Sequence, residues 1–216
     1  MSFRKLFEIL LIIFVVTINY ENISYGKSLM NNYKINSKII DLKKYDALNL
    51  DNTANAFIEI EAGENLKWEF NEKNNSIEVE IKNGKPRKIN YLGYPFNYGF
   101  IVNTKLKKKF GGDGDPLDII VLDQHKVNRG ELIRVKVIGM IGMKDKGLID
   151  NKILSVSLDS KFEEIQNIKD LEFKYPGVID IIKIWFENYK GEKIQILRTF
   201  SKKEAIKFIK KTTIPV

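Results

Sequence analysis

The chain has 216 residues, 44% of them hydrophobic and 11% aromatic, so it can bury one sizeable core, and its length favours one catalytic domain over two. It contains no cysteine, which excludes a disulfide framework, a thiolate metal site and cysteine-nucleophile chemistry. Its formal net charge of +8 is typical of proteins that attract polyphosphates, nucleic acid or anionic lipid. Because no RNP, zinc-finger or helix-turn-helix signature occurs, we do not expect a nucleic-acid partner.

Residues 1–26 contain the parts of a secretory signal peptide. Arg4 and Lys5 precede an almost wholly apolar run at 6–18, and residues 24–26 form a small-x-small ending. The run is short for a bilayer-spanning helix, which needs about 20 residues, so an uncleaved membrane anchor is the alternative. We therefore expect an exported protein, periplasmic or secreted, with membrane-anchored and cytoplasmic protein as the alternatives. Membrane contact is expected only if this segment is not cleaved.

Strand patterns dominate the chain up to about residue 156, and helical patterns follow. Residues 27–56 are polar and rich in Asn and Lys, and we interpret them as an N-terminal extension to a domain over 57–216. The expected strands are 57–60, 67–70, 77–81, 119–122, 132–138 and 153–156, and the expected helices are 177–189 and 202–211. Strands first and helices last predict an α+β, mainly β fold, with a mostly antiparallel barrel or sheet flanked by two helices in the C-terminal half.

Three carboxylates fall within six residues, at Asp113, Asp115 and Asp118, directly before the apolar run 119–122. Asp, Gly and Pro favour a turn and the apolar run favours a buried strand, so these carboxylates are expected at a strand mouth. Clustered carboxylates suit Mg²⁺, Mn²⁺ or Ca²⁺. An EF-hand loop is excluded, because its sixth and twelfth positions would hold Asp118 and Gln124. A phosphatase with an aspartyl nucleophile would place its carboxylates after the strand.

Two further acidic pairs can be explained without a functional role. Asp145 and Asp150 lie in a loop between two expected strands, where they could simply form a hairpin tip. Glu59 and Glu69 lie on adjacent expected strands, where a solvated strand face explains them equally well. The single histidine, His125, is interpreted as a surface or turn residue, because a histidine-based zinc site would need more partners.

The order of these motifs resembles that of the family I soluble inorganic pyrophosphatases, over roughly residues 57–210. Asp113-Gly114-Asp115-Pro116-Leu117-Asp118 fits the family signature Asp-x-Asp-Pro-x-Asp. Upstream, residues 94–100 are similar to its Tyr-Pro-x-Asn-Tyr-Gly segment. Downstream, residues 145–152 match Asp-x₄-Asp-x-Lys, and residues 186–190 match a late helix that ends in Tyr-Lys.

The resemblance implies a five-stranded OB-like antiparallel barrel, a homo-oligomer with a hexamer as one form, and hydrolysis of pyrophosphate to two orthophosphates. It implies Mg²⁺ as cofactor, with Mn²⁺ or Zn²⁺ as substitutes. The metal ligands implied are Asp113, Asp118, Asp145, Asp150 and Glu59. Asp115 is the implied catalytic residue, which accepts the proton of a metal-bound water. The residues implied to bind phosphate are Lys67, Arg87 (or its neighbour Lys88), Tyr98, Lys152, Tyr189 and Lys190, with Glu69 and Tyr94 supporting the site from behind.

Several positions depart from the family pattern, at the rim of the site more than among the expected metal ligands. Lys146 stands where the family commonly has an acid. Two other functions stay open at this point, an exported non-catalytic protein that binds polyphosphate or another polyanion, and a broader phosphohydrolase. Asp115 separates the first of these from the enzyme, because a protein that only binds needs metal ligands and no proton acceptor.

Overall fold

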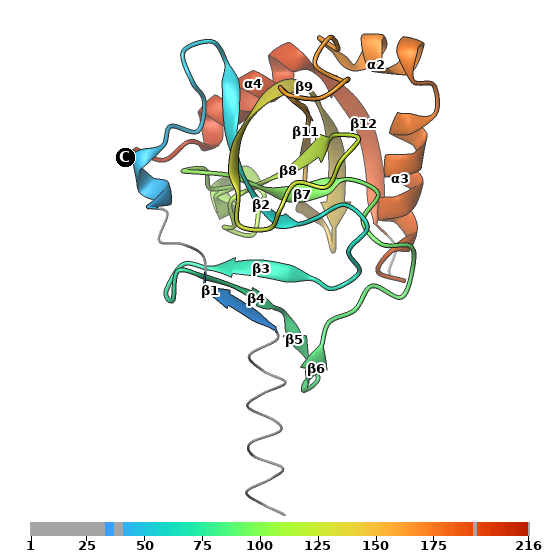
Figure 1. Ribbon diagram of the computed structural model, residues 1–216. Helices are drawn as coiled ribbons and strands as arrows, with labels where there is room; N and C mark the ends of the chain where they lie inside the picture. Colours follow the sequence, from blue (N-terminus) through green and yellow to red (C-terminus); the bar gives the residue numbers. More distant parts are fainter. Residues whose placement is uncertain (1–32, 37–40, 192–193, 216) are drawn as a thin grey trace, which may run out of the picture.

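The computed structural model describes residues 33–36, 41–191 and 194–215, and its centre is a ring of five strands (Figure 1). The ring runs β2–β7–β8–β11–β9 and closes through a pairing between β9 and β2. The ring strands are β2 (Thr53–Ile60), β7 (Asn97–Ile101), β8 (Leu117–Leu122), β9 (Leu132–Asp145) and β11 (Lys152–Ser157). Closure leaves these strands without free edges. The predicted five-stranded, mainly β architecture is confirmed.

One pairing in the ring is parallel. β8 and β11 run side by side in the same direction, with Ile153 opposite Ile119, whereas the other ring pairs are antiparallel. The expectation of an antiparallel barrel is therefore corrected at this point. The parallel pairing matters for the site, because it brings the beginnings of β8 and β11 next to each other.

The remaining strands extend the ring or lie below it (Figure 1). A second sheet has the order β1–β4–β3, and β5 and β6 form a hairpin beside it. These strands are β1 (Lys34–Asn36), β3 (Trp68–Asn71), β4 (Ser76–Val79), β5 (Ile81–Lys82) and β6 (Lys85–Pro86). β10 (Leu148–Ile149) and β12 (Gln195–Ser201) both pair with the long strand β9. Two short 3₁₀ turns, η1 (Leu42–Lys44) and η2 (Lys108–Phe110), complete these elements.

Three α-helices cover the ring in the described part of the chain, one more than predicted. They are α2 (Ile168–Lys174), α3 (Val178–Asn188) and α4 (Lys202–Thr212). Gly177, in the left-handed conformation, separates α2 from α3. A capping box begins α4, in which Ser201 and Glu204 each bind the other's backbone N–H. The two longer helices confirm the periodic pattern, whereas the seven residues of α2 are too few to show one.

The core has two parts, because alternate residues of the ring strands face opposite sides. In β8, Ile119 and Val121 belong to a cluster shared with α4, and Ile120 and Leu122 belong to a cluster shared with α3. β2 is buried on both faces along its whole length, and it begins at Thr53 rather than Phe57. The interpretation of a solvated strand face around residue 59 is therefore wrong, since the second sheet covers this face.

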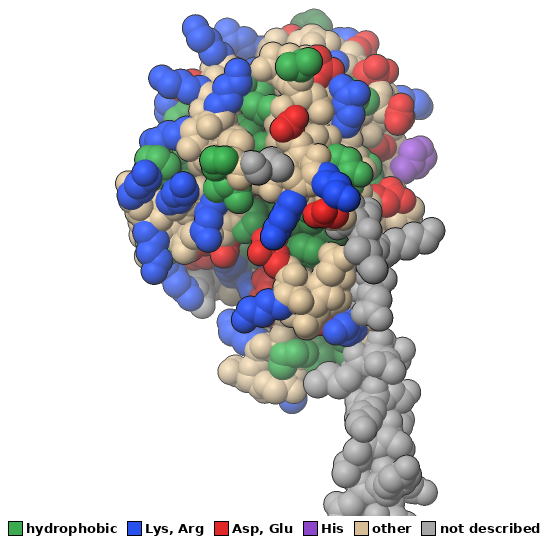
Figure 2. Space-filling model, turned by 90° about the vertical axis from the view of Figure 1, so that its left-hand side faces the viewer, with side chains coloured by type: hydrophobic (Ala, Val, Ile, Leu, Met, Phe, Trp, Pro, Cys, Tyr) green, Lys and Arg blue, Asp and Glu red, His purple; other side chains and the backbone are tan. Residues whose placement is uncertain are grey.

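Positive charge is abundant on the outer surface. Figure 2 shows many lysine and arginine side chains gathered on one side of the face in view, with fewer carboxylates among them. No helix in the described ranges is long and apolar enough to cross a membrane. The predicted leader, residues 1–26, and residues 27–32 of the predicted extension lie outside the described residues.

Candidate active site

Nearly all of the predicted site residues line one cavity at the mouth of the ring. This central cavity has a volume of about 270 Å³, with carboxylates and cationic side chains facing one another. Its predicted lining residues are Lys67, Glu69, Arg87, Tyr98, Asp113, Asp115, Asp118, Asp145, Asp150, Lys152, Tyr189 and Lys190. Glu59 lines a second cavity that adjoins the first, and Tyr94 lies behind the aromatic wall.

Backbone hydrogen bonds fix the loop between β7 and β8, which carries Asp113 and Asp115 to the central cavity. The N–H of Leu106 donates to the carbonyl of Asp115, and the N–H of Gly114 donates to the carbonyl of Leu106. The carboxylate of Asp113 accepts from the N–H of Asp115 at 2.9 Å and so forms an Asx turn. The turn chemistry of the sequence therefore places a carboxylate pair at the beginning of β8.

The parallel pairing brings Asp118, near the beginning of β8, next to the beginning of β11. Lys152 is the first residue of β11, and its ammonium contacts the carboxylate of Asp118 and lies 2.6 Å from that of Asp150. Its side chain is only 3% exposed, so both contacts are shielded from water. Residues that are 34 positions apart in the sequence thus form one buried ionic cluster.

The pKa values in this cluster follow from burial and charge. Burial opposes ionisation of Asp118, but the adjacent Lys152 charge and hydrogen bonds from Lys152 and Tyr98 outweigh it and lower the pKa. For Asp150 burial dominates, and with the nearby Asp118 charge it raises the pKa. Burial disfavours the charged form of Lys152, yet Asp118 and Asp150 raise its pKa. We therefore expect this lysine to be charged at neutral pH.

Unlike Asp118, Asp145 and Asp150, Asp115 forms no ion pair with a described cation. Burial raises its pKa, and the charges of Asp113 and Asp118 raise it further, while Lys67 and Lys105 oppose them. It lines both adjoining cavities. A carboxylate with a raised pKa at this position suits a proton acceptor better than a paired carboxylate would.

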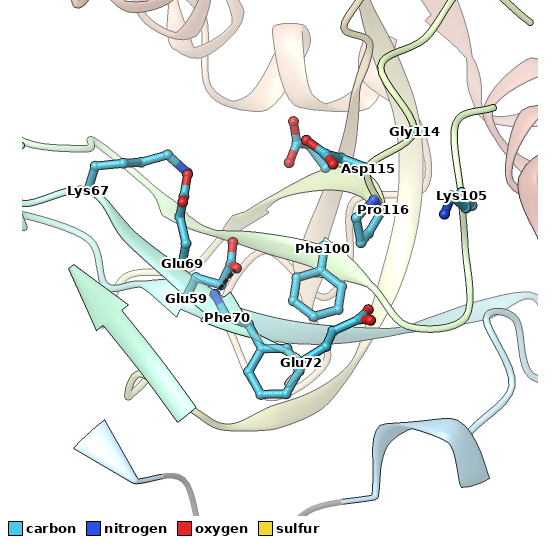
Figure 3. A pocket seen from close by; sticks show the side chains of 11 residues that line it. Glu59, Lys67, Glu69, Phe70, Glu72, Phe100, Lys105, Gly114, Asp115 and Pro116 are labelled. Carbon is cyan, nitrogen blue, oxygen red and sulfur yellow. Dashed lines mark hydrogen bonds and ion pairs between the residues drawn. The ribbon is translucent and has the colours of Figure 1, made fainter. Parts of the chain in front are cut away.

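The second cavity is acidic and has a volume of about 370 Å³. Figure 3 shows Glu59 and Glu69 directed into it from β2 and β3, with the rings of Phe70 and Phe100 below them. Glu59 is 8% exposed, and its carboxylate accepts from the N–H of Phe70 at 2.7 Å. Burial raises the pKa of Glu59 to about 7, against the opposing charge of Lys67. Glu69 is half exposed and lies 3.5 Å from Lys67.

A tight hairpin turn places Asp145 at the central cavity. Asp145 ends β9 and pairs with Leu148, with only Lys146 and Gly147 between them. Both turn residues have positive φ, 49° and 84°, as a type I′ turn requires. The carboxylate of Asp145 contacts Lys190. Burial opposes ionisation of Asp145, but the hydrogen bond and charge of Lys190 outweigh it and lower the pKa of Asp145.

Aromatic packing positions the phosphate-binding candidates on the opposite wall. Tyr189 follows the last residue of α3 and stacks on Trp185 at 4.4 Å, which holds the helix end at the cavity. Burial raises the pKa of Tyr189 to about 12. Tyr94 is buried against Trp185 at 4.5 Å and Tyr98 at 5.5 Å, and burial raises its pKa as well. These tyrosines are therefore neutral hydrogen-bond donors at physiological pH.

The arginine of the site can be assigned by position. Arg87 lines the central cavity and binds the carboxylate of Glu80 at 2.5 Å. Its neighbour Lys88 does not line the central cavity. Of these two candidates, only Arg87 lines the central cavity.

Three further residues belong to the site and were missed in the sequence. Lys105 and Glu72 line the acidic cavity, and Asn151 lines the central one. Lys105 was missed because it precedes the lysine run 107–109, a pattern that is typical of a solvated loop. Asn151 accepts from the N–H of Met143 and so fixes the hairpin beside Asp150. For Asn151, the available signal was an amide side chain between Asp150 and Lys152 in the matched motif.

The donor set fits hard divalent cations. The converging side chains supply carboxylate oxygens and no sulfur or imidazole, the chemistry that Mg²⁺ and Mn²⁺ prefer. In the described ranges no three acidic or histidine side chains stand close enough to bind an ion as they are. Instead, Lys152 contacts the carboxylate of Asp150, and Lys190 contacts that of Asp145. The carboxylates whose chemistry suits such cations are thus paired with two lysines in this structure.

Comparison with known proteins gives one consistent family. A family model described as "Inorganic pyrophosphatase" matches residues 56–214. A relative named inorganic pyrophosphatase from Campylobacter jejuni is 33% identical over 154 residues, which are 70% of this chain and 82% of the relative. Another with that name, from Saccharolobus solfataricus, is 37% identical over 141 residues, 63% and 73% of the two chains.

Solved structures agree with the sequences. The type I inorganic pyrophosphatase from Plasmodium falciparum superposes with a TM-score of 0.71 at 30% identity, covering 78% of this chain and 60% of that one. A truncated vacuolar soluble pyrophosphatase from Trypanosoma cruzi, in complex with PPi, gives 0.73 at 28% identity, with coverage of 81% and 74%. By its sequence and its fold, this chain belongs to the inorganic pyrophosphatase family.

Proposed function

We propose that this protein hydrolyses inorganic pyrophosphate to two orthophosphates with the help of Mg²⁺. Family membership supports the activity. The observation that carries the proposal for this chain is the central cavity, where clustered carboxylates face lysine, arginine and tyrosine side chains. Carboxylates that bind metal opposite groups that bind phosphate are what phosphoryl transfer to water requires, because the reaction depends on positioning and charge neutralisation.

The carboxylates have separate proposed tasks. Asp113, Asp118, Asp145 and Asp150 would hold the metal ions of the central cavity, and Glu59 would help to hold another on the acidic side. When bound, such ions lower the pKa of a coordinated water and neutralise phosphate charge. Asp115 accepts the proton of the attacking water, and its raised pKa supports this role.

The cationic and phenolic side chains bind the substrate in this proposal. Lys67, Arg87 and Lys190 neutralise phosphate oxygens, and Tyr98 and Tyr189 donate hydrogen bonds. Lys152, already paired with two carboxylates, supports the site by holding Asp118 and Asp150 in place. Glu69 lines the cavities beside Lys67, and Tyr94 lies behind the aromatic wall, and in this proposal they orient the groups that touch substrate.

The experiment is a substrate panel with the purified protein. We expect phosphate release from pyrophosphate with Mg²⁺, its loss with chelator, partial recovery with Mn²⁺ or Zn²⁺, and far slower release from phosphomonoesters. Equal rates on phosphomonoesters would contradict the proposal. If the folded protein releases no phosphate but binds polyphosphate, it is a non-catalytic polyanion-binding protein instead.

We also propose that residues 1–26 direct the protein out of the cytoplasm. A basic start, an apolar run and a small-x-small end support this. The test is fractionation of cells that express the full chain, with N-terminal sequencing of the product. A periplasmic or secreted chain that begins near residue 27 is expected. An intact N-terminus in the membrane or cytoplasm would contradict cleavage and export.

We also propose that the protein forms a homo-oligomer. Large apolar side chains are exposed on and beside α3, with Leu92 71% exposed and Ile181 and Ile184 more than half exposed. Such patches mark contact surfaces. Analytical ultracentrifugation should give a mass several times that of one chain, with a hexamer as one specific form. A monomer at micromolar concentration would contradict the proposal.

A further inference from the structure

The net charge of this chain is concentrated in two segments. Residues 103–112 and 202–215 contain nine of the 36 lysine and arginine residues and one of the 28 acidic residues, so they carry the whole formal charge of +8. The rest of the chain has 27 residues of each sign and is neutral. The positive charge of the protein is therefore a local feature and not a property of its whole surface.

The two segments meet at the C-terminal end of α4. The N–H of Lys105 donates to the carbonyl of Thr212 at 2.8 Å. The ammonium groups of Lys211 and Lys109 lie 4.2 and 5.1 Å from the centre of the Phe110 ring. Figure 2 views the molecule from the side on which Figure 1 places the C-terminus, and lysine and arginine side chains gather on part of that face. The exposed lysines of the two segments, which we call the lysine patch, are Lys105, Lys107, Lys108, Lys109, Lys203, Lys207, Lys210 and Lys211.

The charges of the lysine patch are not neutralised by ion pairs. None of its lysines pairs with a carboxylate within residues 33–36, 41–191 and 194–215. The one acidic residue of the two segments, Glu204, binds Ser201 and Arg198 instead. Lys203 and Lys210 lie about 10 Å apart along α4, which is about one Debye length at 0.1 M salt, so their charges act together on a ligand.

The stability of α4 does not account for these lysines. Lys203 and Lys207 are like charges four positions apart, as are Lys207 and Lys211, and such pairs destabilise a helix. The macrodipole favours lysine in the last turn of α4 but disfavours it in the first turn, where Lys203 lies. A charge pattern that lowers the stability of its own helix is expected where the charge serves binding.

The patch suits an extended anionic surface better than a small anion or a nucleic-acid strand. Apart from Lys105, none of its lysines lines the acidic or the central cavity, and a small ligand needs a concave site. The aromatic side chains of the two segments, Phe110 and Phe208, are both half-buried, so neither offers an exposed ring on which bases stack. Clusters of about four to eight basic residues on an amphipathic helix are typical of contact with anionic lipids.

We propose that the lysine patch docks the folded protein on a bilayer that contains anionic phospholipid. The ammonium groups contact the headgroup phosphates, while Ala205 and Ile209 keep the apolar face of α4 packed on the ring. This docking needs neither the pyrophosphatase activity nor residues 1–26, through which alone the sequence predicted membrane contact. Because Lys105 also lines the acidic cavity, docking brings that side of the site near the bilayer.

The test is co-sedimentation of the full chain with vesicles of phosphatidylcholine and phosphatidylglycerol, and with vesicles of phosphatidylcholine alone. Lys203→Gln/Lys207→Gln/Lys210→Gln removes three charges from the patch, and glutamine has a helix propensity close to that of lysine. Thermal unfolding shows whether the fold is kept, and the midpoint should not fall, because the substitutions remove like-charge repulsion.

The matched control is Lys73→Gln/Lys161→Gln/Lys169→Gln, which removes three exposed charges outside the patch and leaves the same net charge. All three proteins keep residues 1–26, so a difference between them belongs to the patch. We expect the wild type and the control to bind the anionic vesicles at low salt and to leave them at high salt, and the patch variant to bind about 10²-fold more weakly.

Three results with vesicles would overturn the proposal. They are no binding by the wild type, equal weakening in both variants, and equal binding to both kinds of vesicle by all three proteins. Binding of the wild type to double-stranded DNA without binding to vesicles would assign the patch to nucleic acid and would overturn it as well.

Discussion

Glu59 gives a sharp test of the electrostatics, through the substitution Glu59→Gln. The buried carboxylate has a pKa of about 7 in the folded protein and an ordinary value of 4.5. A raised pKa means that the folded protein holds a proton that the unfolded chain has already released. Between these two pH values, stability therefore falls as the pH rises, by about 3 kcal/mol in total.

Glutamine cannot ionise, and its carbonyl oxygen can still accept the N–H of Phe70. The variant should match the wild type at about pH 4 and exceed its stability by about 3 kcal/mol at about pH 8, without metal. Urea unfolding in the presence of a chelator measures both values. Glu69→Gln is the matched control, because its carboxylate lies on the neighbouring strand and is 49% exposed.

A stability difference that stays constant across this pH range would refute the reasoning, because it would mean that Glu59 has the same pKa in the folded protein as in the unfolded chain. Addition of Mg²⁺ extends the test. If Glu59 is a metal ligand as proposed, Mg²⁺ should stabilise the wild type more than the variant and narrow the difference. No narrowing would remove Glu59 from the set of ligands.

Three further substitutions test other parts of the structure. Lys152→Met should destabilise the metal-free protein by about 3–5 kcal/mol, because it leaves Asp118 and Asp150 without their buried partner, and Mg²⁺ should restore part of the loss in urea unfolding. An effect below about 1 kcal/mol would contradict the buried cluster. Gly99→Ala should cost about 3 kcal/mol or prevent folding, because the new Cβ would stand 1.9 Å from the carbonyl oxygen of Phe57 on the paired strand, and normal thermal stability would show that β2 and β7 are not this close. Ser201→Ala should cost about 1 kcal/mol through loss of the capping box at α4, and no change in the unfolding midpoint would contradict that cap.

The sequence patterns predicted those strands and helices whose formation depends mainly on neighbouring residues. The apolar run after Asp118 gave β8, and the helical period gave α3 and α4. β7 was not predicted as a strand, because its residues were recognised only as part of a motif, and β12 has no clear alternation. The parallel pairing of β8 and β11 depends on how the ring closes, which no periodicity reveals.

The same limit applies to the candidate site. The motif order indicated which residues would converge, and the central cavity brings twelve of them together. The burial of Glu59 was not predictable, because its alternating strand resembles one with a solvated face until the second sheet is placed over it. The pairing of Lys152 with two carboxylates was also missed, since it follows from the parallel register. The roles assigned to these residues stay predictions.

The most direct test of the central claim is phosphate release from pyrophosphate by the wild type and by Asp115→Asn, with saturating Mg²⁺. Asp159→Asn is the control, because this carboxylate is exposed and lies outside both cavities of the site. The account predicts Mg²⁺-dependent release by the wild type and the control, and a loss of about 10²-fold or more in kcat for Asp115→Asn. Full activity of Asp115→Asn would contradict the proposed proton acceptor, and no release by the folded wild type would contradict the enzyme.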